Sequence, residues 1–329
     1  MKVATMRMLL VAVVLLYFSG AQAAEKRLTV LVTTFPLHQI TRNIVQNVPG
    51  IDVELMIPAQ MGCPHDYSLT PQDMRKLGRA DVLIVNGLGL EEFLGAPLKK
   101  ANPRLKVIDS SKGINQVLQY TDSEANDAGD QRQQARKGAD RHKNHAHKDH
   151  DHEHSHGPNP HLFASPRMAA LLADNIGKAL ATLHPEGAPY YPANAATYSQ
   201  RLNQLADSFV ELGKRLHNNR IVTQHGVFDY LARDMGLKVV AVVQAHAGQQ
   251  PSAAEMLQIT QAIKKNKAGA VFTEPQYPEA VGAAIAKEAG VVAARLDPVA
   301  NGPEQAPLDY YEQTMRANLV TLEQTLGSN

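Results

Sequence analysis

Short runs of aliphatic and β-branched residues alternate with longer amphipathic stretches along most of the chain. In the first half these runs are typical of buried strands, which are predicted at 28–33, 53–57, 81–86 and 107–109. Helices are predicted between them, at 35–48 and from Thr70 to Gly78, where Thr70, Pro71 and Asp73 form a favourable helix start. Because strands separated by helices pair in parallel, the pattern predicts an α/β domain with a parallel sheet.

The same alternation returns in the second half, after two helices predicted at 168–183 and 193–217. Beyond them, strands are predicted at 221–223, 238–243, 270–273 and 291–296, and helices at 228–235, 253–264, 279–289 and 310–326. We therefore predict two doubly wound α/β domains with parallel-type sheets, 24–191 and 218–329, joined by one long rigid helix at 192–217. Ligands of such sheets lie outside the carboxyl ends of the strands, so a site is expected in the interdomain cleft.

The N-terminus has the pattern of a secretory signal peptide. Lys2 and Arg7 accompany an apolar run at 8–18, and a small-residue cleavage site ends at Ala23, so residues 1–23 are expected to be removed. The run is shorter than the about 20 apolar residues that cross a bilayer, and an uncleaved anchor is the alternative. No cysteine directly follows the signal, so the mature chain is expected to be a soluble periplasmic protein without a lipid anchor.

Charge and cysteine content narrow the class of protein further. The chain has 33 Lys and Arg against 32 Asp and Glu, a formal net charge of +1, so it has no basic field of the kind that binds nucleic acid. The single cysteine, Cys63, permits no internal disulfide, and the fold must depend on its hydrophobic cores.

Between about 121 and 160 the periodicity is lost, and the chain becomes polar and poor in aliphatic residues. This segment is predicted to be a long mobile insertion in the first domain. It contains half of the chain's 14 histidines: His142, His145, His147, His150, His152, His154 and His156. Imidazole nitrogens suit zinc, copper and nickel, so the insertion is expected to bind additional metal ions weakly. A merely solvated loop or a vestigial tag is the alternative interpretation.

Four further residues lie where strands or loops end. They are His65, His161, His225 and Asp297, two from each predicted domain. Three neutral imidazoles and one carboxylate would form a four-coordinate zinc site in the cleft. Taken singly, each histidine is more typical of a hydrogen-bonded surface residue, and Asp297 is equally typical of a turn cap before Pro298.

The other histidines outside the insertion are interpreted differently. His38 lies on the first predicted helix, and His184 and His217 lie at helix ends, so all three are expected to be structural or surface residues. His246 lies in a Gly- and Gln-rich loop, from which it could face the cleft. Glu274, directly after a predicted strand, is expected to orient a ligand histidine.

Several motifs resemble those of the metal-binding receptors of bacterial zinc and manganese ABC importers. They are Pro64-His65-Asp66-Tyr67-Ser68-Leu69-Thr70-Pro71, Ala80-Asp81, Asn86-Gly87-Leu88-Gly89-Leu90-Glu91, Asn159-Pro160-His161, Thr223-Gln224-His225-Gly226-Val227-Phe228-Asp229-Tyr230, Val271-Phe272-Thr273-Glu274-Pro275-Gln276 and Leu296-Asp297-Pro298. The resemblance covers nearly all of the mature chain and is strongest to the zinc-type, ZnuA-like periplasmic receptors, which typically carry a histidine-rich loop before the second ligand.

The resemblance implies metal ligands at His65, His161, His225 and Asp297, and one long rigid helix between the domains. In some zinc-type relatives the carboxylate is replaced by water or another acid. Cys63, two residues before His65, is a further candidate ligand, and a thiolate there would favour zinc.

The function implied by the resemblance is that of a solute-binding protein, not an enzyme, which captures Zn²⁺ and delivers it to a membrane permease driven by an ATPase. A separate periplasmic zinc chaperone is a candidate partner, and the receptor is expected to be a monomer. Zinc is favoured over manganese because nitrogen ligands suit zinc, and because manganese relatives tend to have a carboxylate at the position of His225.

Three alternatives remain. The first is a manganese or iron receptor of the same family, and the second is a periplasmic zinc store or chaperone that depends on the histidine-rich insertion. The third, a zinc hydrolase, is disfavoured, because four protein ligands leave no open position on the metal and no HExxH-type helix is predicted.

Overall fold

The computed structural model describes residues 27–64, 67–120, 157–244 and 250–327. Five of the sequence predictions concern residues outside these ranges: the signal peptide at 1–23, the ligand His65, the mobile insertion over 121–156, the seven histidines within it at 142–156, and His246. Among the described helices, none has both the length and the apolar character that crossing a bilayer requires.

The N-terminal half contains a four-stranded parallel sheet, as predicted. Its strands are β1 (Leu28–Val32), β2 (Ile51–Leu55), β3 (Val82–Val85) and β4 (Lys106–Asp109), in the order β2-β1-β3-β4. The helices of this half are α2 (Phe35–Ile44), α3 (Pro71–Arg79) and α4 (Gly95–Ala101), with a short 3₁₀ helix at Glu92–Leu94. The start of α3 is the one expected, because Thr70 and Asp73 form a reciprocal capping box ahead of Pro71.

The sequence pattern did not predict α4. This helix has seven residues, contains Gly95 and Pro97, and buries none of its side chains, so it lacks the apolar spacing by which a helix is recognised.

The C-terminal half repeats the architecture of the first. Its strands are β5 (Arg220–Thr223), β6 (Lys238–Val242), β7 (Ala270–Thr273) and β8 (Val292–Arg295), all parallel and in the order β6-β5-β7-β8. Its helices are α8 (Asp229–Met235), α9 (Ala253–Asn266), α10 (Glu279–Ala289) and α11 (Tyr310–Leu326). The predicted fold class, two α/β units with parallel sheets, is confirmed.

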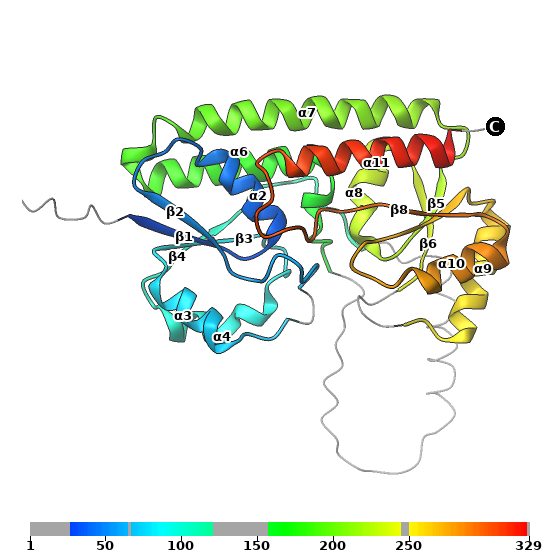
Figure 1. Cartoon of the computed structure of the whole chain (residues 1–329), viewed down its shortest axis with the longest axis horizontal. Coiled ribbons are helices and arrows are strands. Elements are labelled where there is room, and N and C mark those ends of the chain that lie inside the picture. The colour runs from blue at the N-terminus through cyan, green and yellow to red at the C-terminus, as the bar shows by residue number, and fades with distance from the viewer. Residues whose placement is uncertain (1–26, 65–66, 121–156, 245–249, 328–329) are drawn as a thin grey trace, which may run out of the picture.

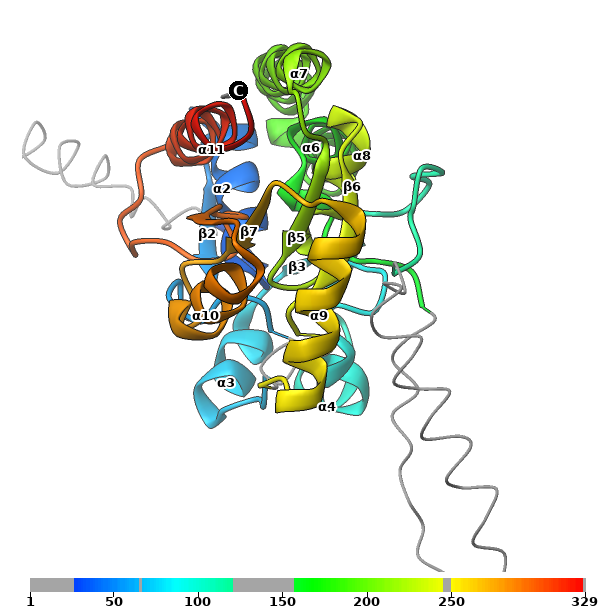
Figure 2. The ribbon, with the colours of Figure 1, turned by 90° about the vertical axis from the view of Figure 1, so that its right-hand side faces the viewer.

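In the central strands of each sheet, alternate side chains enter different cores. In β1, Val30 and Val32 pack in a large core with α2 and α6 (Pro166–Leu183), while Leu31 points to the opposite face, toward α3. In β7, Phe272 enters the large core and Val271 faces α9 and α10. Figure 2 shows the resulting layers, with the sheets lying between one group of helices above and another below.

The large core is continuous through both halves. The long helix α7 (Tyr191–Arg215), predicted at 193–217, contacts α2 and α6 as well as α8 and α11, and it runs across both halves in Figure 1. Its buried stripe includes Tyr198, Leu202, Leu205 and Phe209. One shared core therefore fixes the two sheets relative to each other.

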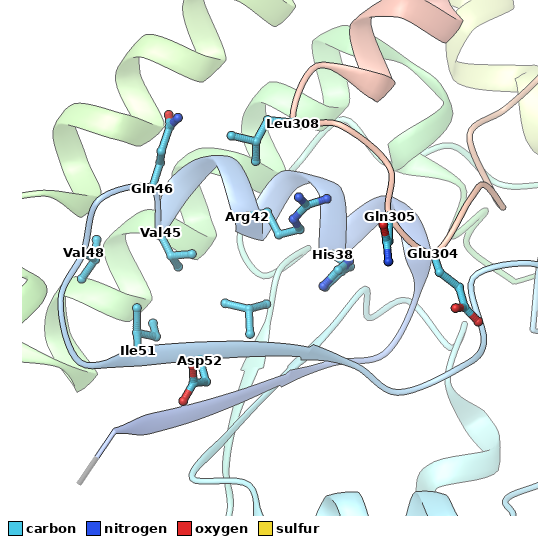
Figure 3. A pocket seen from close by; sticks show the side chains of 11 residues that line it. His38, Arg42, Val45, Gln46, Val48, Ile51, Asp52, Glu304, Gln305 and Leu308 are labelled. Atoms are coloured by element: carbon cyan, nitrogen blue, oxygen red, sulfur yellow. The ribbon is translucent and has the colours of Figure 1, made fainter. Parts of the chain in front are cut away.

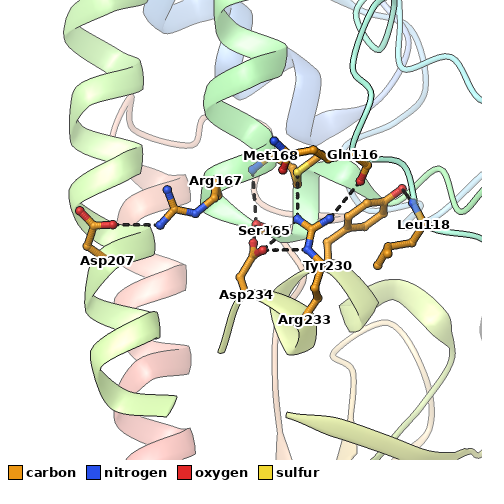
Figure 4. Close-up of polar contacts among 9 residues, drawn as sticks. All are labelled: Gln116, Leu118, Ser165, Arg167, Met168, Asp207, Tyr230, Arg233 and Asp234. Atoms are coloured by element: carbon orange, nitrogen blue, oxygen red, sulfur yellow. Dashed lines mark hydrogen bonds and ion pairs between the residues drawn. The ribbon is translucent and has the colours of Figure 1, made fainter. Parts of the chain in front are cut away.

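Hydrogen bonds made by side chains also connect the two halves (Figure 4). The Arg233 guanidinium of α8 donates to the Gln116 carbonyl at 2.9 Å, and Ser165 Oγ, at the start of α6, donates to Asp234 Oδ2 at 2.6 Å. Tyr230, also on α8, bonds to the backbone of the N-terminal half. The helix α8 is thereby attached to the segments that lead to His161.

Candidate metal site

The candidate site lies at the carboxyl ends of the central strands. His225 comes two residues after β5, and Glu274 directly follows β7, the strand that pairs with β5. Asp297 comes two residues after β8, and His161 immediately precedes a 3₁₀ helix at Leu162–Ala164. This position agrees with the rule that doubly wound sheets bind ligands where the strand order reverses.

Two of the predicted ligands are brought together, and a third group joins them. Cys63 Sγ and one ring nitrogen each of His161 and His225 all lie within 4.8 Å of one another, the one such group of possible metal ligands within the described ranges. The two imidazole rings meet edge to face, with centroids 5.0 Å apart. His161 is 0% exposed and His225 is 3% exposed, so both imidazoles are shielded from bulk water.

A buried carboxylate orients His225. Its Nδ1 lies 2.7 Å from Glu274 Oε1, and because a carboxylate can only accept, Nδ1 carries the proton and Nε2 is the nitrogen that a metal ion would use. Glu274 is 0% exposed, and its Oε2 accepts a hydrogen bond of 2.5 Å from Gln276 Nε2. Burial by itself lowers the pKa of His225, but the charge and hydrogen bond of Glu274 together with the contact of Cys63 outweigh burial, so the pKa is raised. This geometry agrees with the orienting role expected of Glu274.

An amide orients His161. Asn159 Oδ1 lies 2.8 Å from His161 Nδ1 and also accepts from the His161 backbone N–H at 3.0 Å. The Asn159 Nδ2 group donates to the Gly226 carbonyl at 2.7 Å and to Asp229 Oδ2 at 3.0 Å. Asn159 thus links His161 to the residue that follows His225. Sequence reasoning gave Asn159 no role, although it stands two residues before a predicted ligand.

The segment that carries Asn159 is paired with residues 118–120. The Asn159 backbone N–H donates to the Leu118 carbonyl at 2.8 Å, and Gln119 and Pro158 form an antiparallel bridge. Tyr230 Oη donates to the Asn159 carbonyl at 2.6 Å and accepts from the Leu118 N–H at 3.1 Å. Residues 157–160, which were predicted to be the end of the mobile insertion, are therefore part of the structured site.

Asp297 lies near this group without being one of its members. Its Oδ1 accepts from the Val299 N–H at 2.7 Å, and Asn318 bonds to both the N–H and the carbonyl of Asp297. Burial raises the pKa of Asp297 to about 6, and the negative charge of Glu274 acts in the same direction. Its carboxylate oxygens are not within 4.8 Å of all three clustered ligand atoms.

The remaining histidines that the structure describes have other surroundings. His38 lines a hollow of about 560 Å³ between α2, β2 and the loop around Leu308, away from the clustered ligands (Figure 3). Burial, followed by the charge of Arg42, lowers the pKa of His38 to about 4. His184 Nδ1 lies 2.6 Å from Tyr191 Oη, and His217 is exposed. The structural or surface interpretation of these three histidines agrees with the geometry.

Comparisons with known proteins indicate the family to which the chain belongs. The profile of the family described as zinc-uptake complex component A periplasmic (ZnuA) matches residues 30–325. The chain is 29% identical over 307 residues to the zinc-binding protein AdcA of Streptococcus pyogenes serotype M3. The matched region covers 92% of this chain and 56% of AdcA. The chain thus spans little more than half the length of that relative.

Two further relatives match over most of their length. The high-affinity zinc uptake system protein ZnuA of Bacillus subtilis is 27% identical over 311 residues, 93% of this chain and 90% of that protein. The solved structure of FpvC of Pseudomonas aeruginosa in complex with Mn²⁺ has a TM-score of 0.71 at 26% identity and covers 92% of this chain and 98% of FpvC. Since the family profile extends through both α/β units, the chain belongs to the family of zinc-uptake complex component A periplasmic proteins, ZnuA.

Proposed function

We propose that this protein captures Zn²⁺ in the periplasm and delivers it to an ABC-type importer. The observation that carries the proposal is the convergence of His161, His225 and Cys63 ligand atoms within 4.8 Å, at the strand ends of a chain in a zinc-uptake family. Orientation of both imidazoles through Nδ1 supports it, because hydrogen-bonded partners of this kind are typical of metal-binding histidines.

The proposed ligand set is His65, His161, His225 and Asp297. His65 lies outside the described residues, two positions after Cys63, and it would complete three imidazole ligands. Asp297 is the proposed carboxylate, and its proximity to Glu274 supports a role at the same site. Together the four would close a tetrahedral shell, which suits capture and transfer of an ion better than catalysis.

Zinc is proposed as the transported ion because the clustered ligands are nitrogen and sulfur. Manganese favours oxygen-rich sites, whereas zinc accepts imidazole and thiolate ligands. The alternative, a manganese receptor, is supported by the similarity to FpvC in complex with Mn²⁺.

The rest of the molecule is assigned consistently with this function. We propose that residues 1–23 direct export, that the histidines at 142–156 bind additional zinc weakly, and that 24–191 and 218–329 are domains linked by the helix at 192–217. The loaded monomer would dock on the permease, whose ATPase drives import, and a periplasmic zinc chaperone could load it. No catalytic role is proposed.

Elemental analysis tests the proposal. The mature chain is stripped with chelator, incubated with equimolar Zn²⁺ and Mn²⁺, and dialysed exhaustively. About one zinc and no manganese per chain is expected, whereas retention of manganese would assign the protein to the manganese receptors. Several zinc ions per chain, lost when residues 142–156 are deleted, would indicate a zinc store instead.

A further inference from the structure

We infer that the sulfur of Cys63, which releases its proton as the metal ion binds, is a direct thiolate ligand of the captured ion, so that the site is a mixed nitrogen and sulfur site. This inference rests on the proposed function, because it concerns the same zinc site. It goes further by giving the fourth position, which the sequence assigned to Asp297, to a sulfur atom.

The distances between the ligand atoms carry the inference. Cys63 Sγ lies in one group with ring nitrogens of His161 and His225, and no two of these atoms are more than 4.8 Å apart. A tetrahedral zinc ion with Zn–N bonds of about 2.0–2.1 Å and Zn–S bonds of about 2.3 Å separates such atoms by roughly 3.3–3.6 Å. The three side chains therefore need to close by no more than roughly 1.5 Å to share one ion.

The loop that carries Cys63 is fixed by the same half of the molecule that supplies His225. The Ala59 carbonyl accepts from the Gly302 N–H at 3.0 Å. Gly62 has a φ of +79°, and a Cβ added there would lie 3.3 Å from Gln276 Cγ. Gln276 in turn donates to the Glu274 carboxylate that orients His225. Gln276 therefore contributes to the positions of both the Cys63 loop and the His225 imidazole.

Asp297 is less well placed for the same position. One of its oxygens accepts the Val299 N–H, and the carboxylate is not a member of the group around Cys63. The two candidate ligands also differ in chemistry, because a thiolate favours zinc over manganese, whereas a carboxylate suits manganese. If Cys63 only packed against the hydrophobic core, its replacement would leave the preference of the protein for zinc over manganese unchanged.

X-ray absorption at the zinc edge tests the inference on the full mature chain, stripped and then loaded with less than one equivalent of zinc. The expected spectrum contains one sulfur at about 2.3 Å beside nitrogens at about 2.0–2.1 Å. The histidine-rich segment at 142–156 contains neither cysteine nor methionine, so zinc bound there adds no sulfur. Cys63→Ser should lose the sulfur, and Met61→Leu, which removes the thioether two positions before Cys63 at a residue that is 53% exposed, should keep it.

Competition between the two metals gives a second measurement. Cys63→Ser is expected to lose at least about tenfold in zinc affinity relative to manganese, since even hydrogen-bonded partners of metal ligands contribute about 10–100-fold. Asp297→Asn should retain the preference of the wild-type protein for zinc.

The outcomes separate this inference from the proposed function. One tightly bound zinc with only nitrogen and oxygen neighbours in the wild-type protein overturns the sulfur ligand and leaves zinc capture intact. A sulfur signal that persists in Cys63→Ser also overturns it. A wild-type chain that retains no zinc contradicts the proposed function itself. If Cys63→Ser does not fold, the wild type and Met61→Leu decide together, because a sulfur signal that is lost in Met61→Leu comes from the thioether and overturns the inference.

Discussion

The imidazole of His225 and the carboxylate of Glu274 form a buried pair, with 2.7 Å between Nδ1 and Oε1. The two residues lie 49 positions apart in the sequence and meet because their strands, β5 and β7, are neighbours in the sheet. The carboxylate orients the imidazole ring and favours its protonated form, which must lose a proton before a metal ion can bind.

Replacement of this carboxylate should weaken zinc binding without unfolding the protein. Glu274→Gln keeps the size of the side chain but loses the charge, and we expect zinc affinity to fall by about 10–100-fold, as is usual for partners of ligand histidines. Competition with a calibrated chelator measures the change. Glu279→Gln is the matched control, because Glu279 is exposed and paired only with Arg295 at the surface. Equal affinity in wild type and Glu274→Gln would contradict the orienting role.

The same pair predicts how zinc binding depends on pH. Glu274 raises the pKa of His225 against the effect of burial, so the metal-free imidazole retains its proton above the usual range near 6.5. Zinc must displace that proton, and its affinity should therefore continue to increase with pH above neutrality and fall on acidification.

Isothermal titration of the wild-type protein and Glu274→Gln at a series of pH values tests this linkage. In the variant the increase in affinity should level off at lower pH, nearer 6.5, because the charge that stabilises the imidazolium is gone. Identical pH profiles for the two proteins would show that this pair does not control proton release.

Asn159 should matter almost as much as Glu274. Asn159→Ala removes the acceptor for His161 Nδ1 and the donor to the Gly226 carbonyl, so one ligand ring loses its orientation and the loop after His225 loses an anchor. A loss of about 10–100-fold in zinc affinity is expected by analogy with other ligand partners. Asn266→Ala, which removes only a bond to its own helix α9, serves as the control. An unaltered affinity in Asn159→Ala would mean that packing alone orients His161.

Tyr230 is expected to act on stability more than on binding. Tyr230→Phe leaves the Leu118 N–H and the Asn159 carbonyl without their shared hydroxyl, which should cost about 1–3 kcal/mol of unfolding free energy. Denaturant titration of the metal-free wild type and variant measures this difference in unfolding free energy. Tyr190→Phe, at a residue that is 43% exposed, should differ little from wild type. A Tyr230→Phe variant as stable as wild type would indicate that water replaces the hydroxyl.

Most of the secondary structure could be predicted from local signals. The strand at Ala270–Thr273 and the helices at Glu279–Ala289 and Tyr310–Leu326 lie where periodicity placed them. The short helix α4 was missed because it buries no side chain and therefore has no apolar period. Residues 157–160 were wrongly assigned to the mobile insertion. Backbone hydrogen bonds to Leu118 and Tyr120 hold them in place, and no local sequence pattern encodes such long-range bonds.

The order of apolar runs and polar residues was enough to predict candidate ligands directly after buried strands, because such a position does not depend on how the strands are arranged. His225 and Glu274 were predicted in this way, whereas His161 was predicted because it lies where the periodicity returns after the insertion. Two features follow only from the three-dimensional arrangement: Asn159 connects His161 to the backbone after His225, and Cys63 forms a group with the two imidazoles to which Asp297 does not belong. The reason is that periodicity fixes which face of each element is buried, whereas convergence of side chains depends on strand order and on the shared core that positions one sheet against the other.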